Sequence, residues 1–521
     1  MKIAFLPYEH DTYSIGSLAK SISEDKNIES FFFISDFFSQ IHSNQYTNRI
    51  LEELGYDNKK IFDILDEIKK INLIQDENKN IEIDFLFLKN IESRFIDLNL
   101  NQLIYKDCHF NDTYHPRDIY YIPKNKNITF KFLELILKKI VRFLESTKPN
   151  VVFSFGPNHL IRNIFYQLSK EYNYKFTSIA HTRILNKYYF CDNNVSTTPK
   201  IFLDTIEKLI KKNDSFDQGK DLLEKIKYRL FNSQGSYDIE NVYNPIILKF
   251  SVIKKIYKSL FFKRLKYFFY DWYKHNKLSS HRSFFKSPYF GVKSYPKAYF
   301  YSLRNILRNY SSKKFFKKLN TKNLNFKYVY FALHNFPENI VYANKYSNNE
   351  LFYIIKISKI IPIDWKVIVK PSPIMNLYDI DAQTTEFYEK ISRIYNCILC
   401  DYEVSAADLI RNSSAVASIA GTNLLEGAIL GKPAFRFGEF NLDKLDGIFS
   451  FEENSFLEII KNYKLNEINN HNVFFESIIK NTFDLEFDKF IYSDPVAASN
   501  KSFENLFLIP FARNLKKFLF N

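Results

Sequence analysis

A glycine-bearing turn within residues 415–439 constrains the fold of this chain more than any other segment. The pattern predicts an apolar strand over Ala415–Ala420, a helix over Leu424–Leu430 and a second strand over Ala434–Phe437. The chain has only 11 glycines, and four of them fall in this unit, at positions 421, 427, 431 and 438. Because glycine allows a close backbone approach, we expect a ligand beside this turn.

The turn has the residue types of an anion site. Gly421 is followed by Thr422 and Asn423, and we expect these two side chains to cap the helix. Free amide groups and the positive end of a helix dipole attract an anion such as a phosphate. An ordinary helix start in an α/β domain is the alternative interpretation of this turn taken alone.

Strands and helices also alternate before this unit. The periodicity predicts strands over 328–333, 366–370 and 397–400, and helices over 348–361, 382–395 and 406–412. Such alternation is typical of a doubly wound parallel sheet, which binds ligands at the carboxyl ends of its strands. Polar residues follow three of the predicted strands, in the segments 334–338, 370–373 and 421–423. We therefore expect these three segments to line one site.

Three segments, in chain order, read YVYFALHNFPENIV, IIPIDWKVIVKPSP and SIAGTNLLEGAILGKP. They resemble the capsule polysaccharide biosynthesis family of GT-B glycosyltransferases, which includes Kdo transferases. The resemblance is clear from Tyr328 to Asp446 and extends over the rest of the chain in outline. It implies two Rossmann-like domains and a nucleotide-activated sugar as the donor.

The match to the family pattern is good at the first and third segments. His334 and Glu338 belong to a Leu-His strand end with a following Pro-Glu, and Thr422 and Glu426 to a Gly-Thr-x-x-x-Glu turn. The second segment departs, because Pro371-Ser372 stands where the family usually has Glu-His. In related sialyl- and Kdo-transferases that histidine contacts the donor phosphate. A CMP-activated donor such as CMP-Kdo is therefore favoured by the resemblance only.

The predicted donor site has the groups that such a transfer needs. A nucleotide-sugar leaves as a phosphate anion, whose charge must be stabilised as the glycosidic bond breaks. Lys370 offers a positive charge, Ser372 and Thr422 offer hydroxyl groups, and the helix near Asn423 offers its amides. Glu426 lies one helical turn beyond Thr422, where it can accept hydrogen bonds from ribose hydroxyls. This set requires neither a metal nor a cofactor besides the donor substrate.

Each of these residues also has a purely structural interpretation. Glu426 is alternatively a solvated or capping carboxylate, Lys370 the partner of a nearby acid, and His334 a hydrogen-bonded core histidine. Their occurrence at successive strand ends favours the donor site.

The amino-terminal half predicts a partner domain, with strands over 2–7, 31–34, 151–155 and 176–180. The resemblance implies that this domain contributes acceptor contacts and often the catalytic acid or base. The catalytic candidates are polar residues at its strand ends: Glu9, His10, Asp11 and His181, with His159 and Arg183 beside them. The Glu-Asp-Gly segment of many family members has no clear match, so the catalytic residue and the stereochemistry stay open.

The strongest charge feature lies between the two halves. From Lys249 to Lys327 the chain has 21 Lys or Arg and a single acid, Asp271, so the segment carries +20 against +15 for the whole chain. Interleaved basic and aromatic residues suit an anionic membrane surface, although nucleic-acid binding predicts a similar composition. We favour the membrane over nucleic acid, because the resemblance implies lipid-linked acceptors. A solvated basic face is the structural alternative.

Length and composition set the domain organisation. We predict an amino-terminal domain over 1–210 with a helical insertion near 38–79, a basic connecting region over 211–326, and a nucleotide-sugar domain over 327–490. The last segment, 491–521, is expected to pack back as a helix on the first domain. No apolar run approaches the length of a membrane span, and we expect a cytoplasmic protein peripheral to the inner membrane.

The sequence therefore predicts an α/β, GT-B-like chain whose two Rossmann-like domains face a cleft. The predicted function is a metal-independent glycosyltransferase of bacterial surface polysaccharide, capsular or lipopolysaccharide, which transfers a sugar such as Kdo from a nucleotide-sugar to a glycan or glycolipid acceptor. Transfer of a polyol phosphate from a CDP-activated donor is one alternative. A non-catalytic partner in polysaccharide export or assembly is the other, and nucleotide affinity separates it from both enzymes.

Overall fold

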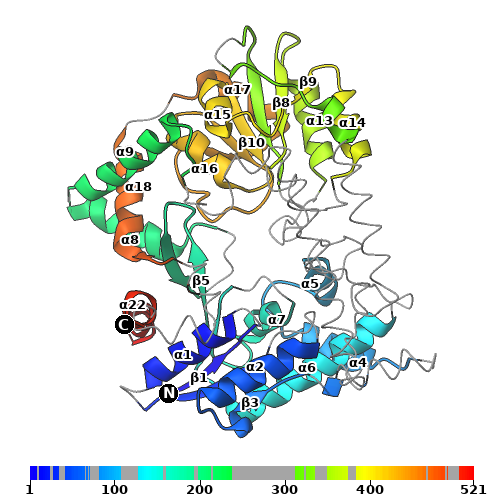
Figure 1. Ribbon diagram of the computed structural model, residues 1–521, viewed down its shortest axis with the longest axis vertical. Coiled ribbons are helices and arrows are strands. Elements are labelled where there is room, and N and C mark those ends of the chain that lie inside the picture. Colours follow the sequence, from blue (N-terminus) through cyan, green and yellow to red (C-terminus); the bar gives the residue numbers. More distant parts are fainter. Residues whose placement is uncertain are drawn as a thin grey trace, which may run out of the picture.

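The computed structural model contains two sheets, each covered by helices on both faces (Figure 1). It describes residues 1–8, 11–23, 27–34, 41–64, 66–67, 70, 81–106, 127–156, 160–192, 197–212, 215–236, 311–321, 324–334, 349–372, 383–464, 468–486, 490 and 504–520. The amino-terminal sheet lies at the bottom of Figure 1 and the carboxyl-terminal sheet at the top.

The amino-terminal sheet has the strand order β13-β6-β5-β4-β1-β2-β3. The strands from β3 to β5 run parallel, whereas β6 is antiparallel to β5 and β13 is antiparallel to β6. The chain order reverses between β1 and β4, which makes that position the topological switch point. The strands are β1 (Lys2–Phe5), β2 (Glu29–Phe33), β3 (Ile61–Phe62), β4 (Val151–Ser154), β5 (Lys175–His181), β6 (Lys187–Cys191) and β13 (Phe483–Asp484).

The carboxyl-terminal sheet has the order β12-β11-β10-β7-β8-β9, and all of its pairs are parallel. Its switch point lies between β7 and β10. Strands such as β7 (YVYFA) are buried along their whole length, as expected for a parallel sheet with helices on both faces. The strands are β7 (Tyr328–Ala332), β8 (Lys366–Lys370), β9 (Cys397–Leu399), β10 (Ala415–Ser418), β11 (Ala434–Arg436) and β12 (Ile448–Ser450).

Helices cover both faces of each sheet. In the amino-terminal domain α6 (Asn127–Thr147) and α7 (Leu160–Leu168) cover one face, and α1 (Thr12–Ser23) covers the other. In the carboxyl-terminal domain one face is covered by α13 (Glu350–Ile360), α14 (Thr385–Ser392) and α17 (Glu453–Asn462), and the other by α9 (Asp217–Phe231), α15 (Ala406–Asn412) and α16 (Thr422–Ile429). Further helices are α2 (Ile41–Glu53), α4 (Phe85–Glu92), α5 (Leu100–Lys106), α8 (Lys200–Lys212), α18 (Ile468–Asn481) and α22 (Ile509–Phe520).

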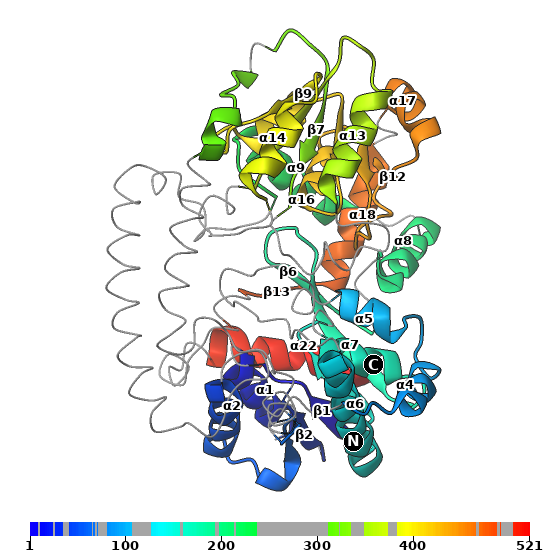
Figure 2. The ribbon, with the colours of Figure 1, turned by 90° about the vertical axis from the view of Figure 1, so that its right-hand side faces the viewer.

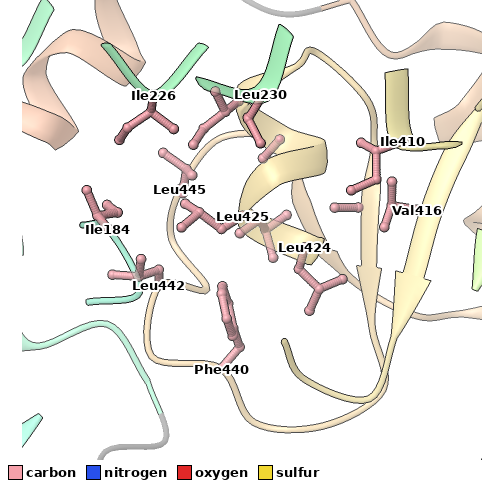
Figure 3. Close-up of a cluster of buried hydrophobic side chains, with 14 of the residues drawn as sticks. Ile184, Ile226, Leu230, Ile410, Val416, Leu424, Leu425, Phe440, Leu442 and Leu445 are labelled. Atoms are coloured by element: carbon pink, nitrogen blue, oxygen red, sulfur yellow. The ribbon is translucent and has the colours of Figure 1, made fainter. Parts of the chain in front are cut away.

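One apolar cluster joins the two domains. It contains Ile184 from the turn after β5, Leu230 from α9, Leu425 from α16, and Phe440 and Leu442 from the loop after β11 (Figure 3). Because burial of apolar side chains stabilises their contacts, this cluster holds the two sheets together as well as filling the carboxyl-terminal domain.

Helix α9 falls in the predicted connecting region 211–326 but packs tightly on α18. A Cβ atom at Gly219 would lie 2.2 Å from the Asn472 carbonyl oxygen, so only glycine fits at this crossing. The Gly219 N–H donates to Glu476 Oε2 at 2.7 Å. The predicted insertion 38–79 contains strand β3, which pairs with β2 and extends the amino-terminal sheet.

The chain returns to the amino-terminal domain at its far end. Strand β13 pairs with β6, and α22 lies against α1 (Figure 2). Phe511 and Leu515 of α22 are buried with Phe5 and Phe153 of the amino-terminal sheet. None of the helices in the described part of the chain has the length and apolar composition to cross a bilayer.

The predicted α/β architecture with two Rossmann-like domains is confirmed, and one boundary needs correction. Helix α16 begins at Thr422 rather than at Leu424, with Gly421 in the N-cap position. Thr422 and Asn423 are therefore inside the helix and do not cap it. Two further glycines are needed for packing and backbone geometry. Gly427 lets α16 approach Val416 of β10, and Gly431, with φ +73°, follows the end of the helix.

Candidate functional site

The switch point of the carboxyl-terminal sheet brings two strand ends together. β7 continues into His334, and β10 continues into Gly421. A Cβ atom at Gly421 would lie 3.5 Å from His334 Nε2 and 3.6 Å from Ser418 Oγ. The histidine ring and the beginning of α16 therefore face each other at the place where this topology binds ligands.

The beginning of α16 carries open backbone donors. Its N-cap residue, Gly421, has no side chain, and no hydrogen bond from a side chain caps the helix. The amide groups of the first turn, at Thr422 and Asn423, therefore lack the partner that a capping residue supplies. Open amides together with the positive end of the helix dipole favour an anion at this position.

His334 supplies an independent sign of a ligand. Its side chain is buried, with 8% of the residue exposed, and among the described residues neither ring nitrogen has a hydrogen-bond partner. Buried polar groups are normally hydrogen-bonded, because an unsatisfied group costs about 1–3 kcal/mol. An anion bound between Gly421 and His334 would give Nε2 a partner.

A hydrogen-bonded network holds His334 from behind. Glu350 Oε1 accepts the backbone N–H of His334 at 2.7 Å and lies 3.4 Å from its Nδ1 atom. Gln383 Nε2 donates to the His334 carbonyl oxygen at 2.9 Å and to Glu350 Oε2 at 3.1 Å. Sequence reasoning missed Glu350 and Gln383, because they lie outside the three strand-end motifs. One indication of Glu350 was present in the sequence, namely its position as an acid in the first turn of the helix predicted over 348–361.

Lys370 ends the neighbouring strand β8. It pairs in register with Ala332 of β7, whose carbonyl oxygen accepts a hydrogen bond from Ser418 Oγ at 3.1 Å. Burial lowers the pKa of Lys370 to about 8, with a partial offset from the nearby Cys400 and Asp401. The described residues provide no hydrogen bond or ion pair to its ammonium group. A buried cation held in this state is a candidate contact for an anion.

Glu426 lies one turn into α16 and is buried. Its Oε1 atom accepts hydrogen bonds from Ser236 N at 3.0 Å and Ser236 Oγ at 3.3 Å. Burial raises the pKa of Glu426 to about 7, and the two bonds from Ser236 oppose that rise. The carboxylate is thus neither solvated nor a helix cap. Its Oε1 atom accepts the bonds from Ser236, so the predicted contact with a ribose hydroxyl would be made by Oε2.

The remaining predicted donor residues are placed in part. Ser372 follows β8 by two residues, and Thr422 and Asn423 are half-buried in the first turn of α16. Glu338 lies outside the described residues.

Asp11 is the catalytic candidate at the switch point of the amino-terminal sheet. Its Oδ2 atom forms an ion pair of 2.8 Å with Arg162 of α7, and its Oδ1 atom accepts the Tyr8 N–H. Arg162 also donates to the Leu6 carbonyl oxygen. These contacts hold the loop after β1, and Asp11 stays a catalytic candidate. Glu9, His10 and His159 lie outside the described residues.

His181 and Arg183 lie where the two domains meet. His181 Nε2 is hydrogen-bonded to the Leu185 carbonyl oxygen at 2.9 Å, and burial lowers the pKa of His181 to about 4. Arg183 covers the ring of Phe440 at 5.2 Å. Asn441 Nδ2 donates to the His181 carbonyl oxygen at 2.9 Å, so the carboxyl end of β5 meets the loop after β11.

Cys397 and Cys400 lie at β9, where Cys400 is buried and Cys397 is half-buried. Neither forms a disulfide, and burial raises the pKa of both thiols to about 12. No group of histidine, cysteine or acidic side chains in the described ranges is arranged to hold a metal ion.

Two Rossmann-like domains, joined where their strand ends meet, define the GT-B architecture. Among solved structures, the chain is similar to KpsC of Thermosulfurimonas dismutans, a beta Kdo 2,7 transferase, with 8% identity, 67% of this chain and 82% of that chain covered, and a TM-score of 0.30. It is also similar to the UDP-GlcNAc 2-epimerases of Neisseria meningitidis and Methanocaldococcus jannaschii. The Neisseria enzyme has 12% identity, and the match covers 92% of this chain and 98% of that enzyme. The Methanocaldococcus enzyme has 14% identity, and the match covers 92% of this chain and 99% of that enzyme. The TM-score is 0.26 in both cases. No protein-family model and no curated protein matches the sequence.

Proposed function

We propose that the protein is a GT-B glycosyltransferase of bacterial surface polysaccharide. It transfers a sugar from a nucleotide-sugar to a glycan or glycolipid acceptor, without a metal. The observation that carries this proposal is the buried His334 ring, which has no hydrogen-bond partner among the described residues. Its Nε2 atom faces the uncapped beginning of α16 at a topological switch point.

The chemistry follows from the groups at this position. The phosphate of the departing nucleotide binds at the open amides of Thr422 and Asn423 and against the His334 ring. Lys370, at the end of the adjacent strand, supplies a positive charge. These donors stabilise the charge that develops on the leaving phosphate as the glycosidic bond breaks. The ribose lies one turn along α16, near Glu426, and a CMP-activated sugar such as Kdo is the favoured donor.

The test is thermal stabilisation of the purified protein by CMP, CDP, UDP, GDP and their sugars. One nucleotide is expected to stabilise the wild type, by about 2.7 kcal/mol at a concentration 100 times its Kd. Lys370→Ala and His334→Gln should each remove most of that gain, because each removes a phosphate contact. Thr422→Ala keeps its backbone amide and should remove only the part of the gain that the Thr422 hydroxyl contributes.

His471→Gln is the matched control, since His471 is buried but its Nε2 atom is already paired with the Asp446 carbonyl oxygen. This variant should keep the full response. If no nucleotide stabilises the wild type, the non-catalytic partner in polysaccharide export replaces our proposal. A phosphodiester among the reaction products would replace it with transfer of a polyol phosphate.

We also propose that the segment 249–327 contacts an anionic membrane surface, where a lipid-linked acceptor would be found. Most of this segment lies outside the described residues. At its described end, Phe316 packs on Tyr388 with ring centroids 5.0 Å apart, and Lys317 N donates to the Leu399 carbonyl oxygen. Lys313 and Lys314 beside this anchor are exposed. The described end of the basic segment is thus fixed to the edge of the carboxyl-terminal sheet, with Lys313 and Lys314 in solvent.

Sedimentation with vesicles tests the membrane proposal. The protein should bind vesicles that contain phosphatidylglycerol, and binding should weaken as salt is raised from 0.05 to 0.5 M, because salt screens exposed charges. Lys313→Glu combined with Lys314→Glu should weaken it further. Equal binding to neutral phosphatidylcholine vesicles would contradict the electrostatic account.

A further inference from the structure

We propose that Glu350 is a positioning residue for the phosphate site. It lies beside Nδ1 of the His334 ring while Nε2 faces the beginning of α16, so that a bound phosphate completes a ring with a proton on each nitrogen. This inference rests on the proposed function, because it assumes that a phosphate group binds between His334 and Gly421.

Glu350 is a buried carboxylate, and the part of the chain that the structure describes offers it one candidate counter-charge. The residue is 2% exposed and begins α13, directly after the helix cap Asn349. Its hydrogen-bond donors are neutral: the His334 backbone N–H and the Gln383 amide. Among the described residues, the His334 ring, 3.4 Å away at Nδ1, is the ionisable partner of this carboxylate. A buried charge is costly unless it is paired, so Glu350 favours a positive ring beside it.

The chemistry of imidazole links this pair to the ligand. A neutral ring carries one proton, so a ring with its proton on Nδ1 would present a lone pair at Nε2. A lone pair repels the oxygen of a phosphate anion. A ring with a proton on each nitrogen can form an ion pair with Glu350, 3.4 Å from Nδ1, and donate a hydrogen bond from Nε2 to the phosphate. Such a charge-assisted bond is about twice as strong as a neutral one.

Gln383 and Tyr388 keep the carboxylate in place. Tyr388 OH donates to Gln383 Oε1 at 2.8 Å, which directs the Gln383 NH₂ group toward Glu350 and the His334 carbonyl oxygen. These bonds hold both oxygens of the Glu350 carboxylate beside the ring. The network holds the His334 backbone and the Glu350 carboxylate in place before any ligand arrives, which lowers the ordering cost of binding.

The experiment uses the full chain, with inorganic pyrophosphate as the probe. Glu350→Gln keeps an oxygen for the His334 N–H but removes the negative charge. We expect this variant to bind pyrophosphate at least tenfold more weakly than the wild type, and Glu350→Asp to recover part of the loss. Glu476→Gln is the matched control, because Glu476 is a buried acid on α18, where it accepts the Gly219 N–H.

A spectroscopic readout separates positioning from mere folding. ¹⁵N spectra of the histidine rings, with the His334 signals assigned from His334→Gln, should show both nitrogens protonated in the wild-type pyrophosphate complex. In Glu350→Gln the ring should be neutral. A neutral His334 ring in the wild-type complex would overturn the inference even if Glu350→Gln does not fold.

The remaining outcomes separate this inference from the proposed function. Unchanged affinity and an unchanged ring state in Glu350→Gln would overturn the role of Glu350 alone and leave the phosphate site intact. A wild type that binds neither pyrophosphate nor any nucleotide would overturn both.

Discussion

Lys370→Met is expected to stabilise the protein at pH 7 and to abolish its response to nucleotides. Burial lowers the pKa of Lys370 from 10.5 to about 8, so the folded protein holds this proton less tightly than the unfolded chain does. The charged lysine therefore destabilises the folded state at every pH below about 8, and this cost fades as the pH rises to 10.5. A difference of this size corresponds to about 3 kcal/mol.

Urea denaturation at pH 7 and pH 10 measures the effect of Lys370→Met. The gain in the free energy of unfolding should be near its full value at pH 7 and much smaller at pH 10. Lys366→Met is the control, because Lys366 begins the same strand and is only half-buried. A loss of stability at pH 7 would show that Lys370 makes favourable contacts that outweigh its burial. Stability lost to a buried cation is typical of a functional site.

Glu426→Gln is expected to change how stability depends on pH. Burial raises the pKa of Glu426 from 4.5 to about 7, so the folded protein binds this proton more tightly than the unfolded chain does. The resulting stability is fully present below pH 4.5 and is lost as the pH rises through 7. The glutamine variant lacks this loss, because its amide is neutral at every pH and its oxygen still accepts the bonds from Ser236.

The comparison of Glu426→Gln with the wild type needs two pH values. Near pH 5 the two proteins should differ little, whereas at pH 8 the variant should be more stable by about 3 kcal/mol. Glu476→Gln controls for the loss of a buried acid elsewhere. A difference that is equal at both pH values would mean that Glu426 does not change its charge over this range.

The strand-end residues could be predicted because they depend on local pattern. Alternating strands and helices predict a parallel sheet, and polar residues after strands then predict its ligand edge, where His334, Lys370 and Gly421 lie. The start of α16 was predicted two residues late, because Thr422 and Asn423 both have strong capping propensity. Gly421 is the N-cap residue instead. Local propensity does not decide whether the helix begins directly after Gly421 or two residues later.

Contacts between distant residues could not be predicted from the sequence. Asp11 was one of several catalytic candidates, and its ion pair with Arg162, 151 positions away in the sequence, could not be predicted. Glu426 looked free for a ligand, yet Ser236, 190 positions away, donates to it. Both pairings depend on how elements pack, and a single sequence contains no periodic signal for such packing. The same reason explains why Glu350 was overlooked beside His334.

The return of the chain to the amino-terminal sheet has a consequence for synthesis on the ribosome. The first domain emerges early, but β13 and α22, which cover the edge of β6 and the face that holds Phe5 and Phe153, are made only after the second domain. Until residues 483–520 are available, that sheet has an unpaired edge and an exposed apolar face, both of which favour aggregation. The two domains therefore cannot mature one after the other. Completion of the first waits for the second, and a nascent chain needs protection throughout its elongation.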